Sequence, residues 1–200
     1  MLNDRQTPGL TWAAAIPLRS YILIAAAVIA FQALVLLAMG QPPICECGYV
    51  TFWHGAVSSS ENSQQLSDWY TYSHVIHGFG FYMLLWLLAP QAPVGMRFVA
   101  AVALEAGWEL VENTPFIIDR YRESALAQGY FGDSILNSVS DSLAAALGFV
   151  LARKLPVWTI LALVVALELF ALLMIRDNLT LNIVQLIAPN EAISRWQMAE

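Results

Sequence analysis

Several long apolar runs constrain the fold of this chain more than any other feature of its sequence. Of its 200 residues, 58% are hydrophobic and only 12% are charged, and the charged fraction is about half that of a soluble domain. An apolar stretch of about 20 residues is long enough to cross a bilayer as a helix. Five segments approach this length, at 21–39, 72–89, 96–113, 135–152 and 157–175. The sequence therefore predicts an all-α, polytopic transmembrane helical bundle of about five spans, which forms a single membrane domain over residues 1–200.

Prolines mark several of the places where these apolar segments end. Pro90 and Pro93 separate the second span from the third, and Pro156 separates the fourth from the fifth. Proline stops one helix and can begin the next, so these breaks favour separate helices. The first span exceeds the ~7–15-residue apolar core of a secretion signal, so we expect a retained helix. The third and fourth spans carry carboxylates, which weakens their assignment by hydropathy alone.

The distribution of Lys and Arg predicts the orientation of the bundle. With five spans, one side of the membrane holds Arg5, Arg19, Arg97, Arg153 and Lys154. Basic residues accumulate in cytoplasmic loops, so the N-terminus is predicted to lie inside and the C-terminus outside. Residues 41–71 then form a long outer loop, and residues 176–200 form an outer-surface tail. The net charge is −6 and no basic cluster occurs, so we expect the lipid bilayer and no nucleic acid as a partner.

Three of the predicted helices carry polar stripes into the membrane. His74 and His77 stand one turn apart at the outer end of the second span. Along the third span, acids at i, i+4 and i+7 share one helical face; they are Glu105, Glu109 and Glu112. The fourth span repeats the pattern at i, i+4 and i+8 with Asp133, Asn137 and Asp141. Carboxylates and amides that face lipid would each cost several kcal/mol, so we expect the three stripes to face one another.

Matching depths predict which of these side chains meet. At a rise of about 1.5 Å per residue, His77, Glu109 and Asp141 fall at one level, and His74 falls one turn above with Glu112 and Asn137. Imidazoles and carboxylates are ligands for Zn²⁺, Mn²⁺ or Fe²⁺. We therefore predict a divalent metal held by His74, His77, Glu109 and Asp141, with Glu112 as the catalytic acid or base. A secondary polar cluster comprises Glu105, Asp133 and Asn137.

Two other interpretations of these stripes stay open. A buried network of ion pairs and hydrogen bonds would fix the register of the helices without binding a metal. The stripes could also conduct protons or metal ions, although five spans without an evident inverted repeat match the repeat-built transporters poorly. The sequence lacks the Glu-x-x-His pairs of di-iron bundles and the His-Glu-x-x-His helix of zinc proteases.

Two arginines follow the third span in the next outer segment, Arg120 and Arg122. Guanidinium groups beside a metal centre suit a phosphate or carboxylate substrate, so both are candidates for binding an anionic head group. The alternative is that they pair with the acids nearby, namely Asp119, Glu123 or Asp133.

A pair of cysteines stands in the long outer loop, at Cys45 and Cys47. The predicted outer loop faces an oxidising compartment, which favours a disulfide. A bridge across one residue is expected to be strained, so it would be labile or redox-active. The alternatives are free thiols, or a second site for a soft metal together with His54.

Several short motifs after the first span are those of a known family. They are ICECG at 44–48, WHG at 53–55, SSENSQ at 59–64, SHVIHG at 73–78, WELVEN at 108–113, IIDRYR at 117–122, GDS at 132–134 and RDNLTLN at 176–182. On these motifs the chain resembles an uncharacterised family of multi-pass inner-membrane proteins from alphaproteobacteria. The resemblance implies a bacterial inner (cytoplasmic) membrane location and no particular activity. Residues 133–148 are also similar, over a short stretch, to the Asp/Asn/Gly helix of VanZ-like membrane proteins.

These features support more than one class of function. The first is a metal-dependent enzyme that acts on a lipid or lipid-linked anion at the outer leaflet. The second is a non-enzymatic assembly factor or complex subunit, whose polar stripes are structural or meet a membrane protein partner. The third is translocation of protons or metal ions. Metal content and co-purification of a stoichiometric partner separate the first two, and uptake into proteoliposomes tests the third.

Overall fold

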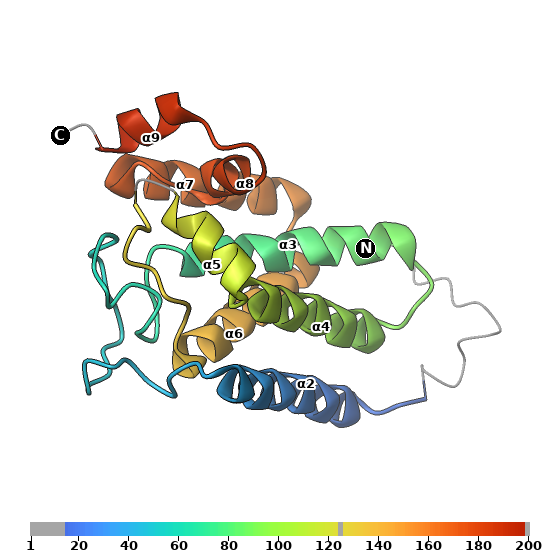
Figure 1. Cartoon of the computed structure of the whole chain (residues 1–200). Helices are drawn as coiled ribbons and strands as arrows, with labels where there is room; N and C mark the ends of the chain where they lie inside the picture. Colours follow the sequence, from blue (N-terminus) through green and yellow to red (C-terminus); the bar gives the residue numbers. More distant parts are fainter. Residues whose placement is uncertain (1–14, 124–125, 199–200) are drawn as a thin grey trace.

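The structure, a computed structural model, describes residues 15–123 and 126–198, and it is helical throughout with no strand in this part of the chain (Figure 1). Five long helices correspond to the five apolar segments; they are α2 (Leu18–Met39), α3 (Thr71–Leu88), α4 (Val94–Glu112), α6 (Ile135–Lys154) and α7 (Val157–Ile175). The described part of the chain also contains three short helices; they are α5 (Pro115–Arg122), α8 (Leu179–Ile187) and α9 (Glu191–Met198). The predicted all-α class is therefore confirmed.

Three of the long helices are apolar enough to cross a membrane. Within the described residues, α2, α6 and α7 have the length and hydropathy of a span. The other two long helices, α3 and α4, do not reach this threshold. The polar stripes explain the difference, because α3 carries two histidines and α4 carries Arg97 and three glutamates. Five spans and the orientation of the termini therefore stay predictions.

The long helices run in alternating directions along the chain. His74 near the start of α3 lies 3.3 Å from Glu109 near the end of α4, so these two helices are antiparallel. Helices α3 and α6 are parallel, because Thr71 contacts Asp141 and, seven residues later in both helices, Gly78 meets Gly148. Phe170, late in α7, packs on Tyr72 at the start of α3, which makes this pair antiparallel.

Helix α2 runs in the same direction as α4. Its first turn meets that of α4, where Tyr21 contacts Gly95. Further along, the Gln32 side chain bonds Ser138, which in turn donates to Glu109. Helices α2, α4 and α7 therefore point one way and α3 and α6 the other, as in a bundle whose chain passes up and down.

Helices α3 and α6 cross at two glycines and come very close there. A Cβ atom at Gly78 would lie 2.1 Å from the carbonyl oxygen of Ala145, and one at Gly148 would lie 2.2 Å from that of Val75. Only glycine fits at such a crossing, which is the way small residues bring helices together in membranes. The crossing places the polar residues one to two turns above it, His74 on α3 and Asp141 on α6, on facing sides.

The long loop between α2 and α3 covers the start of α6. The N–H groups of Ile135 and Leu136 donate to the carbonyls of Pro42 and Pro43, at 2.8 and 3.2 Å. The hydroxyl of Ser134 caps the N–H of the third helical residue at 3.1 Å. The first turn of a helix has N–H groups without partners inside the helix, and here the loop and the cap satisfy them.

The C-terminal tail forms two helices that lie against the end of α7 (Figure 1). The side chain of Glu168 in α7 accepts the N–H groups of Leu179 and Thr180, at 3.0 and 3.2 Å, and so caps α8. In α9, Gln197 donates to the backbone of Arg176 at the end of α7 and to Asp177. A carboxylate inside an apolar helix thus anchors the segment that follows.

Candidate metal centre

Two imidazoles on α3 converge on one carboxylate of α4. Nδ1 of His74 lies 2.5 Å from Oε1 of Glu105, and Nδ1 of His77 lies 3.1 Å from Oε2 of the same residue. Glu105 is fully buried and His74 is 7% exposed. The i, i+3 spacing puts both rings on the same face of α3, and the antiparallel packing of α4 brings Glu105 to that face.

Glu109, one turn further along α4, joins His74 to a second set of polar side chains. Its Oε1 atom lies 3.3 Å from Nδ1 of His74, and its Oε2 atom accepts from the Ser138 hydroxyl at 2.6 Å. Ser138 also accepts from Gln32 of α2 at 2.8 Å, and Gln32 accepts from Ser142 at 2.7 Å. All of these residues are buried, so four helices share one polar layer in the core.

The polar stripe on α6 divides between two surroundings. Asp141 faces the histidines, with Oδ2 3.8 Å from Nε2 of His74. Asp133 lies further out and accepts from Asn113 at 2.7 Å and from Tyr130 at 2.9 Å. The Asn137 amide donates to the backbone of Gln65 in the long loop, at 2.9 Å. Only Asp141 of this stripe therefore approaches the histidines.

A cavity of about 280 Å³ opens beside the two histidines. Its titratable lining comprises His74, His77, Glu112, Asp133, Asp141, Asp177 and three tyrosines, and no Lys or Arg of the described part of the chain lines it. Its apolar wall includes Phe81 and Trp108, and α8 contributes Ile183 and Leu186. The cavity therefore combines a strongly acidic end with an apolar side, which suits a cation beside a hydrophobic group.

Glu112 lines the cavity with a carboxylate oxygen that is free to act as a ligand. Its Oε2 atom is buried and has no hydrogen-bond partner among the described residues, while Tyr121 hydrogen-bonds the same side chain. Oε1 of Glu109 is also buried without a hydrogen bond, although it faces His74. An unpaired buried carboxylate oxygen is costly, and a bound cation would remove that cost.

Two groups of side chains could each hold a metal ion. In one, ligand atoms of His74, His77 and Glu105 lie within 4.8 Å of one another; in the other, those of His74, Glu109 and Glu112 do. Nitrogen and oxygen donors in such a set suit Zn²⁺, Mn²⁺ or Fe²⁺. The two groups share His74, so they describe one extended site along the face of α4.

The structure brings the predicted ligands together but shifts their register by one turn. The depth argument matched His77 with Glu109 and Asp141, whereas His77 meets Glu105. Glu105, predicted to belong to a secondary cluster, is the acid that both histidines contact. Asp141 belongs to neither compact ligand group. The matching of levels assumes regular helices with boundaries known to within a few residues, and it does not fix how far α4 is shifted along α3.

The two arginines of α5 pair with neighbouring residues instead of facing the cavity. Nε of Arg120 donates to the carbonyl of Leu186 in α8 at 3.0 Å, and its Nη1 lies 2.5 Å from Glu123. Arg122 donates to the carbonyl of Tyr130 at 2.6 Å and lies 3.3 Å from Asp119. These contacts agree with the alternative interpretation, in which the two arginines pair with acids nearby. Neither arginine lines the large cavity, so a role in binding substrate gains no support.

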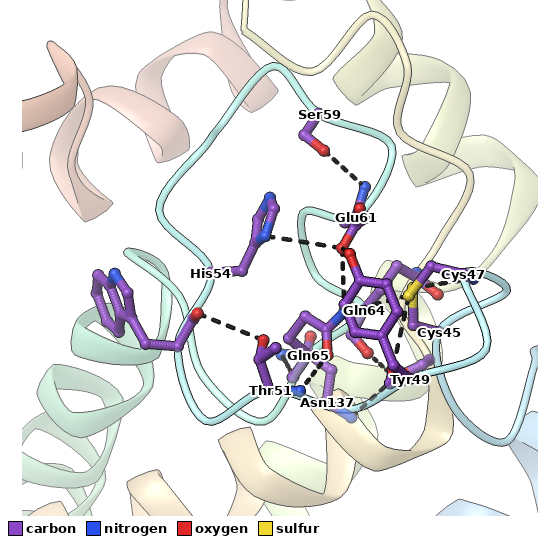
Figure 2. Close-up of a disulfide and its surroundings, with 12 residues drawn as sticks. Cys45, Cys47, Tyr49, Thr51, His54, Ser59, Glu61, Gln64, Gln65 and Asn137 are labelled. Carbon is purple, nitrogen blue, oxygen red and sulfur yellow. Dashed lines mark hydrogen bonds and ion pairs between the residues drawn. A yellow bond between two sulfur atoms is a disulfide. The ribbon is translucent and has the colours of Figure 1, made fainter.

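The two cysteines form a disulfide in the long loop between α2 and α3, as Figure 2 shows. A carboxylate oxygen of Glu61, and not the ring of His54, approaches the sulfurs, and the His54 ring lies 4.0 Å from Oε2 of Glu61. A sulfur in a disulfide is not a thiolate and does not serve as a metal ligand. The prediction of a disulfide is confirmed, and the soft-metal site with His54 does not form in this state.

Two aspartates outside the long helices have raised pKa values. Burial raises the pKa of Asp133 to about 6, against the opposite effect of the hydrogen bonds from Asn113 and Tyr130. Burial likewise raises the pKa of Asp177 to about 6, although Tyr70 donates to it at 3.0 Å. Both line the cavity, so its outer part gains protons as the pH falls below neutrality.

Small polar residues outside the predicted site complete it. Thr71 donates to Asp141 at 3.0 Å, Ser138 donates to Glu109, and Gln32 of α2 bonds Ser138 and Ser142 of α6. Ser and Gln inside apolar spans often bond across helices. Ser138 stands next to Asn137 of the predicted stripe, but nothing in the sequence pairs Gln32 with it.

The fold and the site together define an all-helical protein with helices apolar enough to cross a membrane and a buried cluster of histidines and carboxylates. The profile of the family described as "Protein of unknown function (DUF2585)" matches residues 36–199, and the chain belongs to this family. A UPF0314 protein from Sphingopyxis alaskensis is 53% identical over 88% of this chain and 93% of its own length. Another from Rhizobium meliloti is 51% identical over 98% and 94%. No solved structure matches.

These relatives confirm the predicted resemblance to an uncharacterised alphaproteobacterial family. A third UPF0314 protein, from Agrobacterium fabrum, is 51% identical over 88% of this chain and 89% of its own length. None of the three names assigns an activity, a ligand or a partner. The local similarity of residues 133–148 to VanZ-like proteins stays a prediction.

Proposed function

We propose that the protein spans the bacterial inner membrane five times, with its N-terminus inside and its C-terminus outside. The support is the alternating direction of α2, α3, α4, α6 and α7, three of which are apolar enough to span alone. In this arrangement Arg19, Arg153 and Lys154 lie at one end of the bundle, as the bias of basic residues toward the cytoplasm requires. The histidine cluster then lies toward the outer leaflet.

We further propose that this cluster binds a divalent metal ion and forms the centre of a membrane enzyme. The single observation behind this proposal is the convergence of His74, His77 and Glu105 beside the cavity, with Glu109 and Glu112 one and two turns away. His74, His77 and Glu105 would hold the ion, so Glu105 takes the place of the two predicted ligands Glu109 and Asp141. The ion would supply positive charge that polarises an oxygen of the substrate or of water.

Glu112 is placed to serve as the acid or base. Its Oε2 atom has no hydrogen-bond partner among the described residues, its side chain lines the cavity, and the Tyr121 hydroxyl holds it in position. A carboxylate in this position can take a proton from a nucleophile and return it to a leaving group. Asp141, held by Thr71, orients the outer nitrogen of His74.

An amphiphile with an anionic head group, such as a lipid or a lipid-linked anion, is the substrate class that fits this cavity. The apolar wall of Phe81, Trp108 and Leu186 would contact its hydrocarbon part. Because no Arg or Lys among the residues that the structure describes lines the cavity, the metal ion would have to balance the charge of the head group. Without an ion, the acidic lining would repel an anion.

Elemental analysis of the purified protein in detergent tests the metal centre. We expect about one metal ion per chain in the wild type and its loss in His77→Gln, with the helical circular dichroism retained. His54→Gln is the matched control, since His54 lies in the outer loop away from the cavity and the variant should keep its metal. Retention of the full metal content in His77→Gln would overturn the assignment.

The chief alternative is a structural polar network in a non-enzymatic assembly factor or complex subunit. The observation that favours it is that each imidazole already has a carboxylate partner, Glu105, without any ion. In that case neither the wild type nor His77→Gln contains metal, the variant is less stable, and a stoichiometric protein partner co-purifies. Metal content therefore distinguishes the two functions before any substrate is known.

A further inference from the structure

The disulfide between Cys45 and Cys47 lies in the outer loop and plays no part in the proposed metal centre. Three side chains surround it, and Figure 2 shows them gathered on one side of the sulfurs: Tyr49, Glu61 and Gln65. The Tyr49 hydroxyl donates to Glu61 at 2.6 Å, and the Gln65 amide donates to the same carboxylate at 3.3 Å. The loop therefore builds a polar surrounding for the disulfide.

The two sulfur-bearing residues differ sharply in their access to solvent. Cys45 is 3% exposed, whereas Cys47 belongs to the exposed residues of the loop. A thiolate attacks one sulfur of a disulfide along the S–S axis and expels the other, and access decides which sulfur is attacked. An incoming thiol can therefore reach Cys47 and would expel Cys45.

The surroundings favour that direction of cleavage. The backbone N–H of Cys47 donates to Sγ of Cys45 at 3.2 Å, so a donor already faces the sulfur that would carry the negative charge. The Gln65 amide donates to Sγ of Cys47 at 3.4 Å and holds the attacked sulfur in place. Glu61 has an oxygen within 4.8 Å of both sulfurs and can accept the proton of an incoming thiol.

The position of the bridge argues against a mainly structural role. The two cysteines are separated by only two positions in the sequence. A disulfide stabilises a fold chiefly by restricting the unfolded chain, and the restriction grows with the length of the loop that it closes. A loop this short gives little of that stabilisation. Exposed disulfides are also more easily reduced than buried ones.

We infer that Cys45 and Cys47 form a redox site that accepts two electrons from a protein dithiol at the outer face of the membrane. The partner's thiolate attacks Sγ of Cys47, the Cys45–Cys47 bond breaks, and a mixed disulfide with Cys47 forms while Cys45 leaves as a thiolate. The partner's second thiolate then attacks its own sulfur in the mixed disulfide and expels Cys47. The partner becomes a disulfide, and the two protons that its thiols lose end on Cys45 and Cys47.

Reduction of the folded protein tests this site. The detergent-purified wild type is treated with dithiothreitol, which is itself a dithiol, and free thiols are then labelled with N-ethylmaleimide and counted by intact mass. We expect the exposed Cys47, freed by reduction of the bridge, to be labelled without denaturant and the helical circular dichroism to stay unchanged. If no label enters until denaturant is added, the bridge is structural and the inference is wrong.

Single-cysteine variants test which sulfur is attacked. Cys45→Ser leaves the exposed Cys47 and Cys47→Ser leaves the buried Cys45, and glutathione disulfide is the probe for both. We expect Cys47 to form the mixed disulfide at least about tenfold faster, since access limits the buried thiol. The same reaction in denaturant is the control, where the two rates should converge. Equal rates in the folded protein would contradict the proposed direction of attack, whatever the outcome of the metal analysis.

Discussion

Oε1 of Glu105 lies 2.5 Å from Nδ1 of His74, while Oε2 of the same carboxylate lies 3.1 Å from Nδ1 of His77. One buried acid thus holds both imidazoles. It also determines which ring nitrogens remain for other partners, because Nδ1 of each ring already faces Glu105. Nε2 of His74 then faces Asp141, at 3.8 Å.

Replacing this shared acid should be costly even though the substitution keeps its size. In Glu105→Gln, both imidazoles lose their charged partner inside the core, and breaking a buried pair typically costs about 3–5 kcal/mol. We expect the free energy of unfolding, measured by denaturant titration in detergent, to fall by roughly 3 kcal/mol. Glu123→Gln is the control, because Glu123 is 62% exposed and pairs only at the surface. Equal losses in the two variants would show that Glu105 contributes no more to the free energy of unfolding than an exposed surface acid does.

We expect Glu112 to lower the stability of the metal-free protein, although the proposed reaction needs it. Its Oε2 atom is buried without a hydrogen-bond partner among the described residues, so the neutral amide of Glu112→Gln removes an unfavourable buried charge at an alkaline pH, where the carboxyl group of the wild type is ionised. With the metal chelated, we expect the variant to be more stable than the wild type at that pH by about 1–2 kcal/mol. Without the chelator, it should retain the metal, since His74, His77 and Glu105 are intact. A variant that loses both stability and metal would make Glu112 a structural ligand instead of an acid or base.

The glycine crossing of α3 and α6 predicts opposite effects for two glycines on the same helix. Gly78→Ala places a methyl group 2.1 Å from the carbonyl of Ala145, so the helices must separate, and overpacking of this kind costs about 1–3 kcal/mol. At Gly80 an added Cβ meets nothing within 4 Å, so Gly80→Ala should gain about 0.5–1 kcal/mol from helix propensity. Thermal unfolding in detergent compares the two. Similar midpoints would mean that α3 and α6 do not pack this closely.

Asp177 should make stability depend on pH in a defined direction. Its pKa is raised by burial to about 6 in the folded protein, compared with about 3.9 in an unfolded chain. The folded state therefore binds this proton more tightly, and the resulting stabilisation is complete below about pH 4 and is lost as the pH rises through 6. Relative to Asp177→Asn, the wild type should lose on the order of 2–3 kcal/mol between pH 4 and 7. Parallel pH profiles of the two proteins, measured by urea titration, would contradict the raised pKa.

The long helices could be predicted from the sequence because hydropathy and proline act locally. The segment predicted at 135–152 is the helix Ile135–Lys154, and that at 157–175 is Val157–Ile175. Pro156 separates them and precedes the first residue of the second helix, a position that proline favours. The two histidines of α3 and the three glutamates of α4 likewise lie on single faces, as the 3.6-residue period requires, whereas Asp133 of the third stripe precedes α6.

The pairing between the stripes could not be predicted, because it depends on how the helices cross. The heights of α3 and α6 are set by Gly78 and Gly148, and a glycine in an apolar helix gives no indication of its partner. The contacts of Arg120 depend on the position of α8, which in turn rests on Glu168. Gln32 was passed over because a single uncharged residue scarcely changes the hydropathy of α2.

The way the long loop closes the first turn of α6 limits how an anion could bind. A helix N-terminus normally offers free N–H groups and a partial positive charge to phosphate or carboxylate groups. Here the N–H groups of Ile135 and Leu136 already bond the carbonyls of Pro42 and Pro43. Helix α6 therefore has no vacant amide to offer a phosphate, although its start lies next to Asp133 at the cavity. At this cavity, binding of a negatively charged ligand would then depend on the proposed metal ion, so chelation should abolish binding of the whole ligand and not only its turnover.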